Sequence, residues 1–147
     1  MIGVCGSIAA FKVAVLHKHL RDHMDVTVAM TPSATQFIGA QTFLALTGNP
    51  VITSLWEPSY AKPKHIDLAD ELDLLLIAPA TANILAKAAH GIGDEPVSTL
   101  ILSCLPDEKP IVFAPAMNTR MWKNPATREN VQTLYKRGYH FIAPESG

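Results

Sequence analysis

One asparagine, Asn118, stands where an α/β protein binds its ligand. It follows the apolar run Ile111–Ala114, which is typical of a buried parallel strand. Ligands of open α/β sheets bind beyond the carboxyl ends of strands, and an amide there can hold a carboxylate without adding charge. Met117, Met121 and Trp122 would make a dry wall around it. Asparagine also caps helices well, so the segment equally fits an ordinary helix N-terminus.

A histidine at the end of an irregular segment is the candidate acid–base group. Residues 54–64 contain two prolines and no periodicity, which predicts a loop that leads to His65. Imidazole titrates near neutral pH and can move protons to or from a substrate, although a lone loop histidine also fits a plain surface residue. His19 and His23 share a helical face, but no third ligand accompanies them, so no metal site is predicted.

Three turns rich in glycine, hydroxyl and small side chains follow three expected strands. They are Gly6–Ile8, Thr31–Ala34 and Ala78–Asn83. Taken singly, each turn also fits helix capping, by Ser7, Ser33 or Thr81. The first turn matches neither the dinucleotide fingerprint nor a P-loop. Because carboxyl ends of neighbouring parallel strands meet at one edge, the three turns together predict a mononucleotide-sized cofactor at the switch point of the sheet.

Strand-like and helix-like runs alternate along the chain, and they must position these residues. The expected strands are 2–5, 26–30, 51–55, 73–78, 111–114 and 140–143. The expected helices are 7–23, 32–38, 41–47, 66–72, 82–89, 97–104 and 124–136, the last ended by Gly138. This alternation predicts a three-layer α/β/α, Rossmann-like (flavodoxin-like) doubly wound parallel sheet of about six strands.

Length and composition predict one soluble, cytoplasmic domain over residues 1–147. The formal net charge is −1 and the hydrophobic content 48%, so no electrostatic signature of nucleic-acid or membrane binding is present. No apolar run approaches about 18 residues, and the first residues lack the pattern of a signal peptide. Two isolated cysteines, Cys5 and Cys104, make neither a disulfide framework nor a zinc motif.

Five segments together resemble the flavin-containing cysteine decarboxylase family. They are Gly6–Lys12, His65–Ala69, Ala78–Asn83, Gly91–Asp94 and Pro115–Trp122, in the family's order and across nearly the whole chain. The Pro-x-Met-Asn-x-x-Met-Trp wording and the His65–Ile66 pair are specific, whereas the Gly-Ser turn is common. The wording of the asparagine motif is most similar to the branch that acts in coenzyme A biosynthesis.

The resemblance implies an FMN-dependent carboxy-lyase that converts 4′-phosphopantothenoylcysteine to 4′-phosphopantetheine and releases CO₂. In such enzymes the flavin oxidises the thiol end of the cysteine, carbon dioxide departs to leave an enethiol, and the reduced flavin returns the hydride. It implies His65 as the acid–base group and Asn118 as the group that holds the substrate carboxylate, with Met117 and Met121 beside the substrate. The residues implied to contact FMN are Gly6, Ser7, Ile8, Ser33, Thr81, Ala82, Asn83, Ile84 and Ala116.

The resemblance also implies a homotrimer, or a dodecamer of trimers, that shares FMN and substrate between neighbours. Val97–Cys104 is a candidate for that contact or for core packing. A glycine-rich flap with a proton-donating cysteine is implied beyond Gly147, and neither Cys5 nor Cys104 occupies its place. At Glu95–Pro96 the chain departs from the usual leucine, and a local bend is expected there.

Two other functions remain open on the sequence. A peptidyl-cysteine decarboxylase of lantibiotic biosynthesis shares the fold, FMN, histidine and asparagine, and it stops at the enethiol without a flap. A non-catalytic regulatory flavoprotein shares the fold but typically carries long acidic extensions, which this sequence lacks. The sequence also leaves open a fused synthetase domain.

Overall fold

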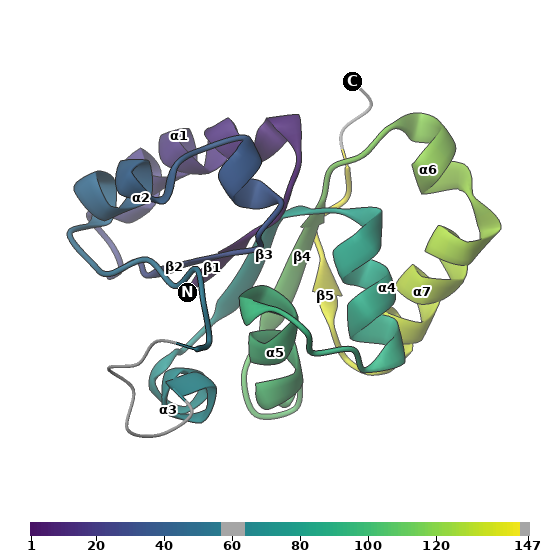
Figure 1. The fold of residues 1–147 in the computed structure, drawn as a ribbon. Helices are drawn as coiled ribbons and strands as arrows, with labels where there is room; N and C mark the ends of the chain where they lie inside the picture. Colours follow the sequence, from purple (N-terminus) through teal and green to yellow (C-terminus); the bar gives the residue numbers. More distant parts are fainter. Residues whose placement is uncertain (57–63, 145–147) are drawn as a thin grey trace.

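The computed structural model describes residues 1–56 and 64–144 of the chain. Five parallel strands form one sheet in the order β2-β1-β3-β4-β5. Their bounds are β1 Ile2–Val4, β2 Val28–Met30, β3 Leu75–Ala80, β4 Ile111–Pro115 and β5 His140–Phe141. Helices cover both faces of the sheet (Figure 1), which confirms the predicted doubly wound α/β architecture.

The predicted strand at 51–55 is wrong, so the sheet has five strands and not about six. Only Ile52 pairs with β2, through an isolated bridge to Ala29. Its N–H donates to the Val28 carbonyl and its carbonyl accepts from the Met30 N–H, both at 2.9 Å. Pro50 has no N–H to extend the ladder, which limits pairing at this edge to one residue.

One face of the sheet is covered by the helices of the first third of the chain (Figure 1). They are the 3₁₀ turn η1 Ile8–Ala10, α1 Phe11–Leu20, the 3₁₀ turn η2 Ala34–Gln36 and α2 Ala40–Thr47. Val4, Val13, Met30 and Phe43 pack into a core on this side. The predicted helix 7–23 is thus split and ends earlier, and the predicted helix 32–38 is a single 3₁₀ turn.

The opposite face is covered by helices from the rest of the chain. They are α3 Lys64–Glu71, α4 Ala82–His90, α5 Pro96–Ser103 and α7 Pro125–Lys136. Leu75, Ile77, Phe113 and Leu134 belong to the core on this side. Val97, Leu100 and Ile101 of α5 are fully buried in the same core, whereas Leu102 is 44% exposed, so core packing accounts for one face of that segment only. Gly138, with φ 92°, follows α7 as predicted.

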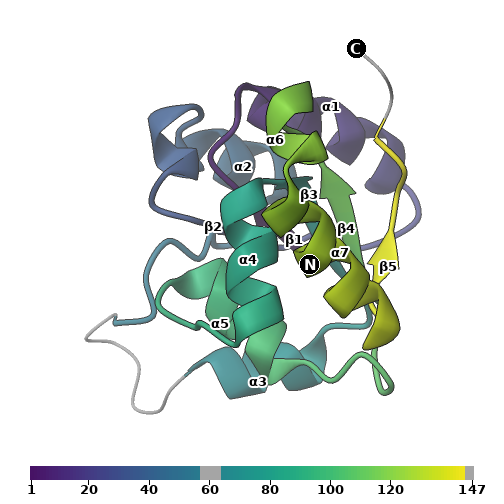
Figure 2. The ribbon, with the colours of Figure 1, turned by 90° about the vertical axis from the view of Figure 1, so that its right-hand side faces the viewer.

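The topology creates a switch point beside β1. The chain passes from β1 to β2 on one side and reaches β3 on the other, so the turns after β1 and β3 diverge. A short helix, α6 Thr119–Lys123, follows β4, at the place where the sequence offered Asn118 as a helix N-terminus. Figures 1 and 2 both place α6 at one end of the molecule and α3 at the other. Among the described residues, no helix is long and apolar enough to span a membrane.

Candidate functional site

A cavity of about 520 Å³ opens at the switch point, here called the switch-point cavity. Its volume lies within the range of small-molecule sites, about 300–1,000 Å³. Most residues that the sequence assigned to a cofactor or substrate line it: Gly6, Ser7, Ser33, Thr81, Ala82, Asn83, Ile84, Ala116, Met117 and Met121. They come from the turns after β1, β2, β3 and β4, so the sheet brings the predicted turns together.

Gly6 lets the first two turns approach each other. A Cβ on Gly6 would lie 2.5 Å from the Cβ of Ser33, far closer than two carbons can pack. The hydroxyl of Ser33 makes no capping hydrogen bond. The side chain that bonds to the start of this turn is Thr31, whose Oγ1 accepts from the Ala34 N–H at 3.1 Å. The capping alternative for Ser33 is therefore wrong, and its exposed hydroxyl is available to a ligand in the cavity.

Replacing Gly6 by alanine is expected to lower the free energy of unfolding by about 1–3 kcal/mol, because the new methyl group forces the two turns apart. Urea denaturation followed by circular dichroism measures the change. Gly39→Ala is the control for an unhindered site, because nothing lies within 4 Å of a Cβ there and its φ is −71°. Gly39 is the N-cap of α2, so this variant is expected to show only the smaller cost of alanine at a cap. Equal stability of the two variants would show that the contact with Ser33 imposes no constraint.

Two hydroxyl side chains of the cavity cap the helices that follow them, as predicted. Ser7 Oγ accepts from the Ala9 N–H at 3.2 Å, and Thr81 Oγ1 accepts from the Ile84 N–H at 3.3 Å. A hydroxyl that accepts from the backbone still has its own proton to donate. Capping thus leaves Ser7 and Thr81 able to bind a ligand.

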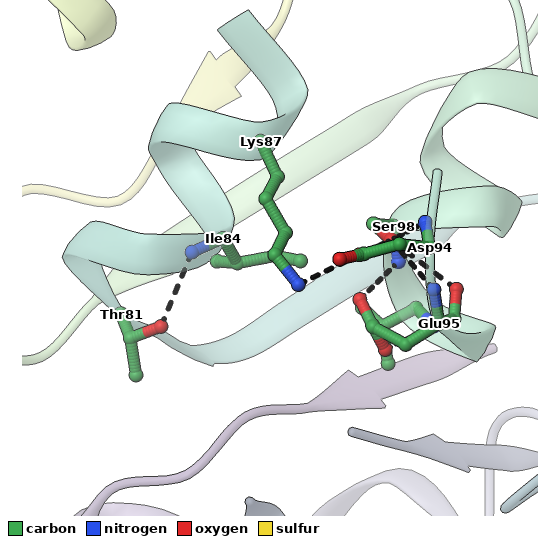
Figure 3. Close-up of polar contacts among 7 residues, drawn as sticks. Thr81, Ile84, Lys87, Asp94, Glu95 and Ser98 are labelled. Atoms are coloured by element: carbon green, nitrogen blue, oxygen red, sulfur yellow. Dashed lines mark hydrogen bonds and ion pairs between the residues drawn. The ribbon is translucent and has the colours of Figure 1, made fainter. Parts of the chain in front are cut away.

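Sequence reasoning missed the charged wall of the cavity, formed by Lys87, Asp94 and Glu95 (Figure 3). Lys87 Nζ donates to Asp94 Oδ1 at 2.7 Å, and this hydrogen bond holds the pKa of Asp94 below its usual range. The Asp94 N–H donates to Ser98 Oγ at 3.2 Å, which ties the loop before α5 to its first turn. The loop between α4 and α5 therefore presents charge to the same cavity as the predicted turns.

Glu95 is a buried carboxylate at the start of α5. Its Oε1 accepts from the Ser98 N–H at 2.7 Å and its Oε2 from the Val97 N–H at 2.9 Å. Ser98 Oγ accepts in return from the Glu95 N–H at 3.3 Å, which completes a capping box. Pro96 occupies the first position of the helix, where a proline fits, and the chain bends at Glu95 just before it, as expected.

A second cavity, of about 890 Å³, lies on the other side of the chain that follows β4. Asn118 lines it together with Ile8, Lys12 and Trp122, whereas Ala116 and Met117 line both cavities. Asn118 Oδ1 accepts from the Arg120 N–H at 2.9 Å and caps α6, so the helix-start alternative is also realised. The amide nitrogen is left to face a ligand.

His65 lies apart from both cavities. It is half-buried in the first turn of α3 and lines neither of them. Because α3 and α6 occupy opposite ends of the molecule in both views, one chain does not bring His65 to Asn118 (Figures 1 and 2). Residues 57–63 of the predicted loop, and the cysteine flap expected beyond Gly147, lie outside the described residues.

Both cysteines are buried thiols. Cys5 lies in the wall of the switch-point cavity, and burial strongly raises its pKa. Burial also raises the pKa of Cys104, just after α5. Since the thiolate is the reactive form, burial makes both cysteines less reactive than a free thiol.

The chain is similar to several known proteins in sequence and in fold. The coenzyme A biosynthesis bifunctional proteins CoaBC of Vibrio cholerae and Mycobacterium bovis are 44% and 42% identical over 100% of this chain, which spans 37% and 34% of their lengths. The solved structure of the FMN-dependent cysteine decarboxylase SpaF superposes with TM-score 0.92 at 37% identity, over 99% of this chain and 83% of that one.

A second solved structure, a PPC decarboxylase mutant complexed with pantothenoylaminoethenethiol, has TM-score 0.87 at 30% identity, over 98% of this chain and 80% of that one. The family model named Flavoprotein matches residues 1–147. The chain belongs to the flavoprotein family.

Proposed function

We propose that residues 1–147 form an FMN-binding domain that decarboxylates 4′-phosphopantothenoylcysteine to 4′-phosphopantetheine in coenzyme A biosynthesis. The observation that carries the proposal is the shared wall of the two cavities. Ala116 and Met117 separate a mononucleotide-sized cavity from the cavity that Asn118 lines. A cofactor and a carboxylate-bearing substrate bound in the two cavities would therefore be neighbours.

The switch-point cavity has the groups to hold FMN. Ser7, Ser33 and Thr81 offer hydroxyl donors for phosphate and ribityl oxygens, and the close approach at Gly6 keeps their turns together. Ile84, Met117 and Met121 offer apolar surface for a flat ring. When bound, FMN would accept a hydride from the carbon that carries the substrate thiol and so activate the carboxylate for loss.

Asn118 and His65 perform the steps that belong to the protein in this proposal. The Asn118 amide donates to the substrate carboxylate and orients it, while Met117 beside it excludes water, so the carboxylate leaves from an apolar surrounding. His65 takes the proton of the substrate thiol and returns one to the product. Because both residues act on the same substrate molecule, Asn118 and His65 must meet at one site.

We further propose that a second copy of the chain supplies His65, as part of a homotrimer. The separation of α3 from α6 in one chain supports this, because a ring of copies can bring the α3 end of one to the α6 end of the next. An exposed apolar stripe beside the second cavity supports it as well. Ile8, Phe11 and Val15 are 77%, 55% and 51% exposed, and their spacing puts them on one helical face.

A peptidyl-cysteine decarboxylase is the second candidate, because SpaF is similar over nearly the whole chain. The test is to bind FMN to the full-length protein and to measure CO₂ release from 4′-phosphopantothenoylcysteine and from a peptide with a C-terminal cysteine. We expect turnover of the first substrate and little of the second. Preference for the peptide would select the second candidate, and a chain that stays colourless with FMN would refute both.

A further inference from the structure

The wall of the switch-point cavity carries more negative than positive side chains. Among the described residues, its charged side chains are one cation, Lys87, and two carboxylates, Asp94 and Glu95. The Lys87 side chain is only 18% exposed, so its position is set by the protein around it. Counted as formal charges, the wall carries −1, and without Lys87 it would carry −2.

The two carboxylates are held in place independently of Lys87. Glu95 accepts two backbone hydrogen bonds at the start of α5, and Asp94 is tied through its own N–H to Ser98 Oγ. Ser98 Oγ also donates to Asp94 Oδ1 at 3.4 Å. Removal of the lysine would therefore leave both negative charges facing the cavity.

A mononucleotide brings its own negative charge into this cavity. A phosphate monoester carries about −1.5 to −2 charges at neutral pH, and reduction of a flavin at this pH adds negative charge to the ring. Like charges in a cleft with low-dielectric walls repel more strongly than in water. The cavity thus needs a cation that offsets the carboxylates without itself blocking the ligand.

We infer that Lys87 has this role: it neutralises Asp94 at the cavity wall and thereby sets the affinity and the reduction potential of the bound flavin. The inference rests on the proposed FMN site and adds a function for residues outside its turns. Lys87 acts through Asp94, so it is a positioning residue of the site. Its effect on FMN is electrostatic, because its positive charge offsets the repulsion between the Asp94 carboxylate and the ligand.

The signs of the expected effects distinguish this role from a mere cross-link between α4 and the next loop. Lys87→Met leaves the negative charge of Asp94 uncompensated and should weaken FMN binding about fivefold. This is the upper end of the energies measured for partly exposed charge pairs. Asp94→Asn removes the repelling charge and should keep or tighten binding. The double variant should return to within about twofold of the wild-type affinity, and Lys87→Arg should match wild type.

The reduction potential should move in opposite directions in the two single variants. A wall with net charge −2 disfavours the more negative, reduced flavin, so Lys87→Met lowers the potential, and Asp94→Asn raises it. A tenfold change in the ratio of affinities for the two oxidation states equals about 30 mV for a two-electron couple. A purely structural contact would not give opposite signs.

The experiment titrates each full-length protein with FMN at low and at high salt, and measures the potential of the bound flavin against redox dyes. Lys136→Met is the matched control, because Lys136 is exposed in the last turn of α7 and lines neither cavity. Thermal unfolding of each variant without FMN checks that it is folded, and Lys87→Gln replaces Lys87→Met if the latter is not. Opposite shifts of potential, with recovery in the double variant, support the inference.

Equal weakening by both single variants, with no recovery in the double variant, would overturn the inference and leave the FMN site standing. A wild-type protein that does not bind FMN would overturn the proposed function as well. The two failures are therefore separate results of one titration series.

Discussion

Replacing Asn118 by aspartate is expected to slow CO₂ release at least about 100-fold while FMN stays bound, comparable to the loss of one essential donor in an active site. An aspartate still accepts the Arg120 N–H that Asn118 Oδ1 accepts at 2.9 Å, so the cap of α6 is kept. What changes is the other half of the side chain, which loses its two donors and gains a negative charge. The substrate carboxylate would meet repulsion in place of a hydrogen bond.

A second asparagine offers a matched control for this prediction. Asn124 Oδ1 accepts from the Ala126 N–H at 2.9 Å and caps α7 just as Asn118 caps α6, and it lines neither cavity. Asn124→Asp should retain full activity, measured as CO₂ released per bound FMN. Equal activity of Asn118→Asp and wild type would remove Asn118 from the reaction and leave it only its role as a helix cap.

The parts of the site that could be predicted from the sequence are those fixed by local rules. Turns after buried strands fall at the carboxyl edge of a parallel sheet, so the sequence alone predicts that Ser7, Ser33 and Thr81 meet at one cavity. The charged wall could not be predicted in this way, because it depends on how the loop after α4 folds back. Gly91, with φ 69°, ends α4 and begins that reversal.

The sequence also predicts that a strand exists more reliably than it predicts where the strand begins and ends. The run at 73–78 correctly predicts a buried strand, but β3 is Leu75–Ala80, because the apolar run alone does not fix the pairing register with β1 and β4. The location of His65 could not be read from the sequence pattern. The short helix α3 ends just before β3 begins and so stays near the amino edge of the sheet, whereas Asn118 follows β4 at the carboxyl edge (Figure 1).

Two inactive variants are expected to restore activity to each other when they assemble together. His65→Asn alone should slow CO₂ release about 100-fold or more, because it removes the group that moves the thiol proton. If His65 of one copy serves the site that holds Asn118 of its neighbour, a mixture with Asn118→Asp contains junctions where both native residues meet. Random assembly of equal amounts in a cyclic ring makes about one quarter of the junctions intact, and about one third in trimers that contain both variants.

The measurement is CO₂ release after the two variants are co-expressed with different affinity tags and the mixed oligomers are purified through both tags. We expect recovery far above the sum of the separate variants, with FMN content unchanged. Variants purified separately and mixed without exchange of subunits are the control, and they should stay inactive. If the mixed oligomers stay as inactive as the parents, each chain must hold its own complete site. His65 would then have to reach Asn118 by a movement of α3 within one chain, although α3 and α6 lie at opposite ends of the molecule (Figures 1 and 2).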